Sequence, residues 1–111
     1  MRLVIELEDI IAHKLASDIA ALENVISCYV IKDGEIIGAE EKQDLKEMAI
    51  IPAALISELC EDFTTAKLRF SDCRAVVVRH EEAELVVFFD KNTPEASILS
   101  DITDIISGVS I

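Results

Sequence analysis

The 111-residue sequence is poor in the residues that interrupt regular structure. It contains three Gly and two Pro, one Tyr and no Trp. So few Gly and Pro leave little room for flexible linkers, and we expect regular elements joined by tight turns. The glycines, Gly34, Gly38 and Gly108, are too widely spaced to form a phosphate-binding loop. A chain of this length is expected to fold as one domain, residues 1–111.

Positive charge is also scarce. The chain has 10 Lys and Arg against 22 Asp and Glu, which gives a formal net charge of −12. Phosphate groups would be repelled, so we expect no nucleic-acid partner and no binding to an anionic membrane surface. A basic protein surface is the natural complement of such a chain. Solubility alone explains the acidity equally well, and that alternative stays open.

The three cysteines, Cys28, Cys60 and Cys73, form no CxxC or Cys/His pattern that would indicate zinc. Each lies in an apolar run, so we expect buried free thiols in a reducing compartment rather than redox centres. The first residues lack the apolar core of a signal peptide, and the longest apolar run, residues 48–56, is too short to span a membrane. These features predict a cytoplasmic protein without membrane insertion.

Candidate catalytic and metal-binding residues are few. His13 falls within a helical pattern, where a surface position is the simplest interpretation, and His80 lies in a polar turn that cannot enclose a substrate. The acidic run Glu40, Glu41 and Asp44 lacks the alternating oxygen ligands and the central glycine of a calcium loop. We therefore predict no enzymatic activity, no metal and no cofactor.

Apolar residues are abundant and make up 51% of the chain. A helical stripe predicts a helix over residues 7–22; its members are Leu7, Ile11, Leu15, Ile19 and Leu22. The run 25–31 is β-branched and apolar, as in a strand covered on both faces. Asp33-Gly34 then predicts a type I′ turn into a strand over residues 35–39. Gly38 within that strand predicts a bulge or a close backbone approach.

The second half of the chain predicts a helix, three strands and a last helix. Asp44 and Glu47 predict a capping box that opens a helix reaching about residue 63. Pro52 falls inside this single helical region and is expected to kink the helix or restart it. Three strands follow, over residues 67–70, 73–79 and 84–90. A last helix follows: Thr93 is its predicted N-cap, Pro94 its first helical residue and Gly108 its C-cap.

The predicted order is helix, two strands, helix, three strands, helix. Strands joined by hairpins indicate an antiparallel sheet, so the fold class is α+β. Because the strands are almost continuously apolar, both faces of the sheet must be covered. We predict a three-layer α/β/α sandwich with a central five-stranded sheet, the first and last helices on one face and the central helix on the other.

This pattern resembles the roadblock/LC7 family, a relative of the profilin and longin folds. The resemblance rests on three stretches: ALENVISCYVIKDGEIIGAE, DLKEMAIIPAALISELCEDF and CRAVVVRHEEAELVVFFDKNTPEASIL. It implies a non-enzymatic, cofactor-free dimer, either a homodimer or a heterodimer with a related domain. Such dimers scaffold or regulate small GTPases and larger protein complexes, and their sheets join edge to edge.

The central helix predicts where such a dimer would form. Its broadest apolar face is expected to bury against the sheet; that face comprises Met48, Pro52, Leu55, Leu59 and Phe63. The opposite side has small residues and one large aliphatic, and the strand after the helix offers an open edge. The predicted dimer surface comprises Ile50, Ala54, Ser57, Lys67, Leu68, Arg69 and Phe70. The alternative function is a small-ligand sensor of profilin/PAS-like shape, which would require a cavity within the sandwich.

Overall fold

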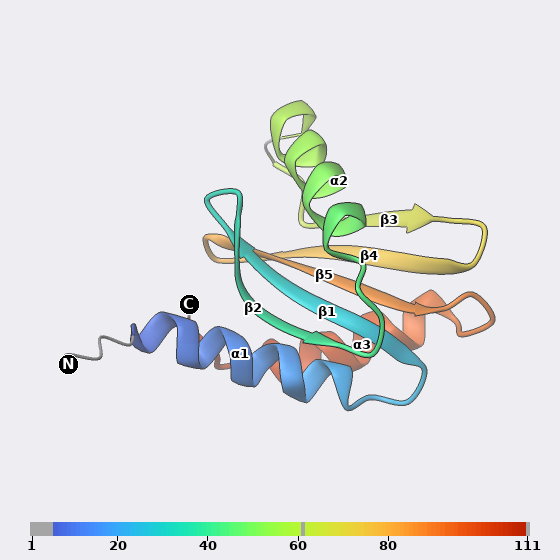
Figure 1. The fold of residues 1–111 in the computed structure, drawn as a ribbon, viewed down its shortest axis with the longest axis horizontal. Coiled ribbons are helices and arrows are strands. Elements are labelled where there is room, and N and C mark those ends of the chain that lie inside the picture. Colours follow the sequence, from blue (N-terminus) through green and yellow to red (C-terminus); the bar gives the residue numbers. More distant parts are fainter. Residues whose placement is uncertain (1–5, 61, 111) are drawn as a thin grey trace.

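A computed structural model describes residues 6–60 and 62–110 and contains three helices and five strands (Figure 1). Their order is the one the sequence predicts. The elements are α1 (Leu7–Ala20), β1 (Val25–Lys32), β2 (Glu35–Glu41), α2 (Lys46–Leu59), β3 (Thr65–Arg69), β4 (Cys73–His80), β5 (Ala83–Asp90) and α3 (Glu95–Ile106).

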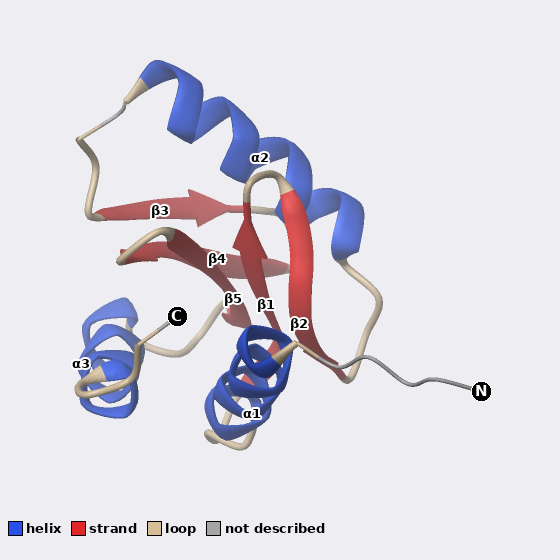
Figure 2. Ribbon diagram, turned by 90° about the vertical axis from the view of Figure 1, so that its left-hand side faces the viewer, coloured by secondary structure: helices blue, strands red, loops and turns tan. Residues whose placement is uncertain are grey.

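The strands form one antiparallel sheet in the order β2-β1-β5-β4-β3. Helices α1 and α3 cover one face, and α2 lies alone on the other (Figure 2). The predicted three-layer α+β sandwich is therefore confirmed. Strands β2 and β3 are the two edges of the sheet, and they lie on opposite sides of the molecule.

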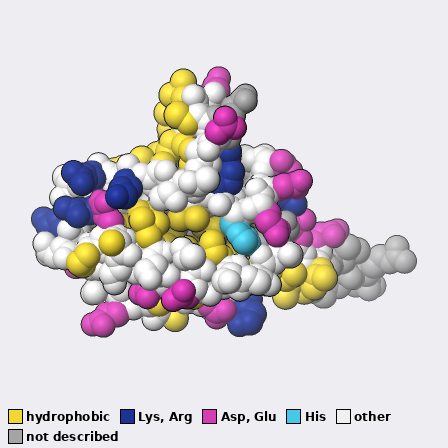
Figure 3. All heavy atoms as spheres, turned by 180° about the vertical axis from the view of Figure 1, so that it is seen from behind, with side chains coloured by type: hydrophobic (Ala, Val, Ile, Leu, Met, Phe, Trp, Pro, Cys, Tyr) yellow, Lys and Arg dark blue, Asp and Glu magenta, His cyan; other side chains and the backbone are white. Residues whose placement is uncertain are grey.

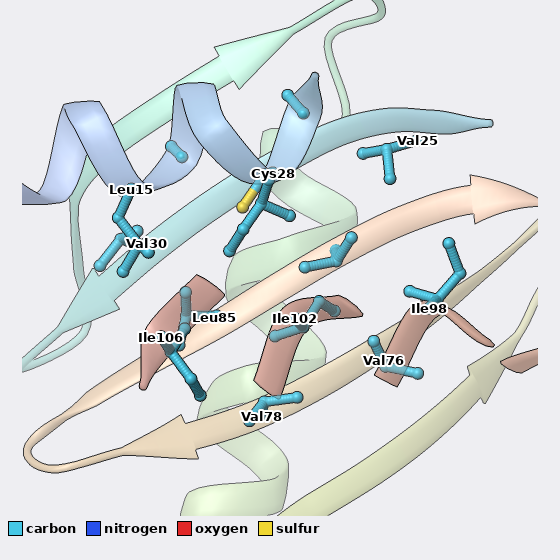
Figure 4. Close-up of a cluster of buried hydrophobic side chains, with 14 of the residues drawn as sticks. Leu15, Val25, Cys28, Val30, Val76, Val78, Leu85, Ile98, Ile102 and Ile106 are labelled. Atoms are coloured by element: carbon cyan, nitrogen blue, oxygen red, sulfur yellow. The ribbon is translucent and has the colours of Figure 1, made fainter. Parts of the chain in front are cut away.

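The larger core lies between the sheet and the helices α1 and α3 (Figure 4). Its fully buried side chains include Ile19 of α1 and Ile102 of α3, which belong to one cluster with Val76 of β4 and Leu85 of β5. The smaller core, on the α2 side, contains Phe88. Strands β1, β4 and β5 are apolar at consecutive positions because both of their faces are buried in this way.

The first hairpin forms as the sequence predicts. Asp33 and Gly34 have φ angles of 53° and 78°, the left-handed values that a type I′ turn requires. Farther along β2 the pairing register with β1 shifts near Gly38, which indicates a bulge. A Cβ atom at Gly38 would lie 2.5 Å from the carbonyl carbon of Ala12 in α1. Both expectations for Gly38, a bulge and a close backbone approach, are confirmed.

The start of α2 differs from the prediction. The helix begins at Lys46, and the expected capping box is wrong: Asp44 accepts a hydrogen bond from the Lys46 N–H at 3.2 Å, before the helix starts. The buried hydroxyl of Tyr29 in β1 supports this end instead. It accepts from the Leu45 N–H at 2.8 Å and donates to Glu41 Oε2 at 2.6 Å. Burial, and then the bond to Glu41, raise the pKa of Tyr29 to about 12.

Other boundaries move by a few residues. Helix α2 ends at Leu59 rather than near residue 63. It forms the single helical region that the sequence predicts, with Pro52 inside it and no restart there. Thr93 is not the N-cap of α3, because its N–H bonds to the Asp90 carbonyl in a turn and Pro94 occupies the cap position. Gly108, with a φ of 86°, follows the last helix as expected.

Two burial expectations turn out differently at helix ends. Leu7, at the start of α1, is exposed although it belongs to the predicted helical stripe. Cys28 and Cys73 are buried free thiols as predicted, whereas Cys60 is exposed at the end of α2. At both exposed positions the helix terminus extends past the sheet, so the apolar pattern continues where no layer covers it.

We predict that Gly38→Ala destabilises the fold by about 1–3 kcal/mol, the usual cost of overpacking. The added methyl group meets the backbone of Ala12 and His13, which cannot rotate away, so α1 must shift off β2. Chemical denaturation would measure the loss, and the amide NMR signals of α1 would move. Gly34→Ala is the control, because its methyl group meets no atom within 4 Å and its cost comes from backbone strain alone. Unchanged α1 signals in Gly38→Ala would contradict the close approach.

We predict that Tyr29→Phe lowers the free energy of unfolding by about 1–3 kcal/mol, because it leaves the Leu45 N–H without its buried acceptor. The difference from the unsubstituted protein should shrink at high pH. The folded-state pKa is raised from 10 to about 12, so this stabilisation is fully present below pH 10 and is lost as the pH rises through 12. Urea denaturation of both proteins across this range measures it; a difference that does not depend on pH would contradict the assignment.

Candidate interaction surface

Helix α2 exposes a row of large aliphatic side chains. Ile51, Leu55 and Leu59 are 60%, 51% and 78% exposed, and they are spaced by four residues along one stripe. We call these three residues the α2 stripe. Only Ala49 and Ala53 of this helix are fully buried, and Met48, Ile50 and Ile56 pack half-buried against the same core. An isolated exposed Leu is ordinary, but three in one row mark a candidate contact surface.

This arrangement corrects the predicted orientation of the helix. The prediction that Leu55 and Leu59 bury against the sheet is wrong, because both side chains are exposed. Tyr29 and Phe88 already fill the sheet surface beneath α2, with ring centroids 6.0 Å apart in an edge-to-face contact. The helix therefore meets the sheet through Ala49, Ala53 and the half-buried side chains beside them, and the α2 stripe lies on its exposed side. Met48, Pro52 and Phe63, from the same predicted face, are half-buried.

The three α2 residues of the predicted dimer surface lie on the opposite flank. Ala54 is exposed, and Ile50 and Ser57 are half-buried. All three line a hollow of about 280 Å³ between α2 and the turns of the two hairpins. Here Ser57 Oγ is hydrogen-bonded to Glu84, and an Arg79 guanidinium nitrogen donates to the same Oγ at 3.3 Å. This flank of α2 is thus tied to the β4–β5 hairpin by a polar network.

The remaining predicted surface residues lie in β3 and directly after it, on two different faces of the sheet. Leu68 and Phe70 are half-buried on the α2 side of the sheet, where the Phe70 and Phe88 rings are 5.9 Å apart. Lys67 and Arg69 point to the α3 side, where both reach Glu95 at the start of α3. In the described part of the chain β3 pairs with β4 alone, so its outer backbone groups form an open edge.

The α2 stripe lies on the flank of α2 that is nearest to this open edge. Met48 and Phe70 line a common hollow of about 220 Å³, so the Met48 flank of the helix faces the end of β3. Leu55 follows Met48 by two helical turns, and Leu59 by a further turn, which places them on the same flank. The structure thus brings exposed aliphatic groups of α2 and the unpaired edge of β3 to one side of the molecule. No sequence signal distinguishes Ile51, which only the rotation of the helix exposes.

The two histidines have different structural roles. His13 is exposed on α1, where its Nδ1 lies 3.5 Å from the Ala39 backbone nitrogen. His80 Nε2 contacts the Val109 carbonyl oxygen at 2.5 Å and so ties the chain end to the β4–β5 hairpin. Among residues 6–60 and 62–110, no three His, Cys, Asp or Glu side chains lie close enough together to hold a metal ion. No helix in these ranges is long and apolar enough to cross a membrane.

Comparison with known proteins gives different answers for sequence and for structure. No family sequence model and no curated protein sequence matches the chain. Solved structures do match. A roadblock/LC7 domain from Streptomyces avermitilis superposes with a TM-score of 0.68 at 16% identity, over 87% of this chain and 92% of that one.

Two bacterial MglB proteins are similar in the same way. MglB of Myxococcus xanthus gives a TM-score of 0.71 at 15% identity, over 96% of this chain and 92% of its own. The gliding protein MglB of Thermus thermophilus gives 0.66 at 15% identity, over 95% and 92%. At these identities the likeness is one of architecture, and it agrees with the element order and the layers described above. The chain has the roadblock/LC7 fold.

Proposed function

We propose that this protein is a non-enzymatic dimeric module of the cytoplasm, formed by a single roadblock/LC7-like domain over residues 1–111. In this proposal it scaffolds or regulates a small GTPase or a larger protein assembly. The observation that carries the proposal is the α2 stripe beside the open β3 edge. The resemblance of the sequence to roadblock/LC7 proteins supplies the class of partner, and one solved MglB structure of this fold is described as having a tetrameric arrangement.

Charge limits which surface can make a dimer. Two identical chains, each with a net charge of −12, repel one another at long range. Their contact must therefore be apolar and low in charge. The α2 stripe meets this requirement, since each fully buried Leu or Ile side chain contributes about 1.5–3 kcal/mol relative to its exposed state. Covering the stripe would also remove the largest exposed hydrophobic residues of α2 from water.

A two-fold axis at the β3 edge would bring both the β3 edges and the α2 stripes of two copies into contact. Two copies of β3 would pair antiparallel and continue the sheet, while the two α2 stripes meet above the seam. A standard specific interface buries about 1,600 Å² in total, which a strand pair and a helix pair can reach together. The backbone of the sequence-predicted residues 67–70 stays in this proposal as part of the paired edge, whereas the Lys67 and Arg69 side chains point to the α3 side of the sheet, away from the apolar contact. On α2 the proposed contact is made by the stripe. It replaces the contact predicted through Ile50, Ala54 and Ser57, which lie on the flank that faces the hairpin turns.

We predict that Leu55→Asp weakens the dimer by at least about tenfold without unfolding the subunit, because it places an unpaired charge in the apolar contact. Sedimentation equilibrium measures the dimer, and circular dichroism checks the fold. Ala54→Asp is the matched control: it adds the same charge at an exposed neighbouring position on the opposite flank, and the dimer should tolerate it. A monomeric unsubstituted protein at micromolar concentration would contradict the dimer. Disruption by Ala54→Asp alone would move the contact to the flank predicted from the sequence.

We predict that the purified protein retains a small GTPase from an extract of its native host, with retention that depends on whether GDP or a non-hydrolysable GTP analogue is present. The Leu55→Asp variant should retain less, because a regulator of this kind acts as a dimer. Mass spectrometry of the retained proteins gives the measurement. Retention of no GTPase in either nucleotide state would contradict the proposal. A stoichiometric small molecule in native mass spectra, together with that result, would favour the ligand-sensor alternative, for which the 280 Å³ hollow is the candidate site.

A further inference from the structure

Three cationic side chains converge on one carboxylate at the β3 end of the sheet. Lys67 and Arg69 extend from β3, and Arg74 extends from the neighbouring strand β4, where it is the register partner of Arg69. All three reach Glu95 in the first turn of α3. We call these four residues the basic corner. Seen from behind in Figure 3, Lys and Arg side chains gather at one end of the molecule around a single acidic group.

Glu95 does not use up the binding capacity of these cations. Its Oε1 lies 3.7 Å from Arg69 Nε and 3.8 Å from an Arg74 guanidinium nitrogen, and its Oε2 lies 3.5 Å from Lys67 Nζ. Charge-assisted hydrogen bonds are shorter, about 2.7–2.9 Å. Oε1 is buried without a hydrogen-bond partner. The cations are thus held near Glu95 by charge, and their N–H groups stay able to donate to a second carboxylate.

The cations are also accessible. The side chains of Arg69 and Lys67 are 72% and 56% exposed, whereas Glu95 is almost covered by them. Three positive charges against one negative charge leave the corner net positive, although the whole chain carries −12. The corner therefore attracts the anionic groups that the rest of the molecule repels, and this contrast would direct an acidic partner to one place on the surface.

We propose that the basic corner binds the carboxylates of an acidic, extended segment on a partner protein. Lys67 and Arg69 are two residues apart on one face of a strand, a distance of about 7 Å, which matches alternate side chains of an extended segment. The planar fork of an arginine binds a carboxylate with two parallel hydrogen bonds. A nucleic acid is disfavoured because three cations would have to overcome the repulsion of its phosphates by the rest of the chain.

This site is separate from the surface proposed for the dimer. The α2 stripe and the β3 backbone edge would lie in the seam, whereas the basic corner lies on the α3 face of the sheet. A two-fold axis that pairs two β3 edges brings both α3 faces to the same side, so two basic corners would adjoin across the seam. The inference rests on the proposed function only where it places two basic corners side by side in a dimer, since each corner is complete within one chain.

The test is an NMR titration of the ¹⁵N-labelled full chain with an acetylated, amidated octaglutamate peptide at low ionic strength. We expect chemical-shift changes centred on Lys67, Arg69, Arg74 and Glu95. The Lys67→Gln/Arg69→Gln variant should bind the peptide at least about fivefold more weakly, since it removes two of the three cations. Lys14→Gln/Lys46→Gln is the matched control, because it removes the same two charges at exposed positions elsewhere, and its affinity should equal that of the unsubstituted protein.

Three results would overturn the proposal: no binding of the peptide, equal weakening by both double variants, or displacement of the peptide by oligothymidylate or phosphatidylserine vesicles at lower concentration than by unlabelled octaglutamate. The Leu55→Asp variant separates this proposal from that of the dimer. A monomeric Leu55→Asp protein that still binds octaglutamate at the same residues supports the basic corner whatever becomes of the dimer. A dimer whose basic corner fails to bind would retain the proposed function and lose this site.

Discussion

A five-stranded sheet that is apolar on both faces is the constraint on which this structure depends. Strands β1, β4 and β5 bury side chains at consecutive positions, so each face needs a covering layer. Helices α1 and α3 together provide one layer, and α2 alone provides the other (Figure 2). One helix cannot cover a face as wide as five strands. The β3 side of the α2 face is consequently where apolar surface remains to be covered.

The two layers differ in how closely they meet the sheet. On one face Gly38 lets the backbone of α1 lie against β2 with no room for a Cβ atom. On the other face Ala49 and Ala53 of α2 are buried in the core that contains the Tyr29 and Phe88 rings, and larger side chains of the helix pack there only in part. Helix α2 is then held by polar contacts near its ends, through the Tyr29 hydroxyl at Leu45 and the Ser57–Glu84–Arg79 network. A helix held in this way leaves its outer flank available to a partner.

Charge divides the surface into regions suited to different partners. Long-range repulsion between acidic molecules favours a dimer contact without charge, and the α2 stripe is an exposed surface of that kind. The basic corner reverses the sign of the charge in one place, around Glu95. Both surfaces adjoin β3, the edge strand, but they lie on opposite faces of the sheet. In the two proposals, a second copy would bind through one face and an acidic segment through the other.

Local and periodic patterns alone determined the element order, the Asp33-Gly34 turn and the two-sided burial of the sheet, because each depends on residues near one another in the chain. Gly38 within a strand likewise indicates a close backbone approach, although the sequence does not show which element approaches. The rotation of α2 needed tertiary structure, since it depends on aromatic rings from β1 and β5 beneath it, and periodicity alone places the largest side chains inward. The gathering of Lys67, Arg69 and Arg74 around Glu95 also needed it, because strand register and helix position join residues more than 20 apart.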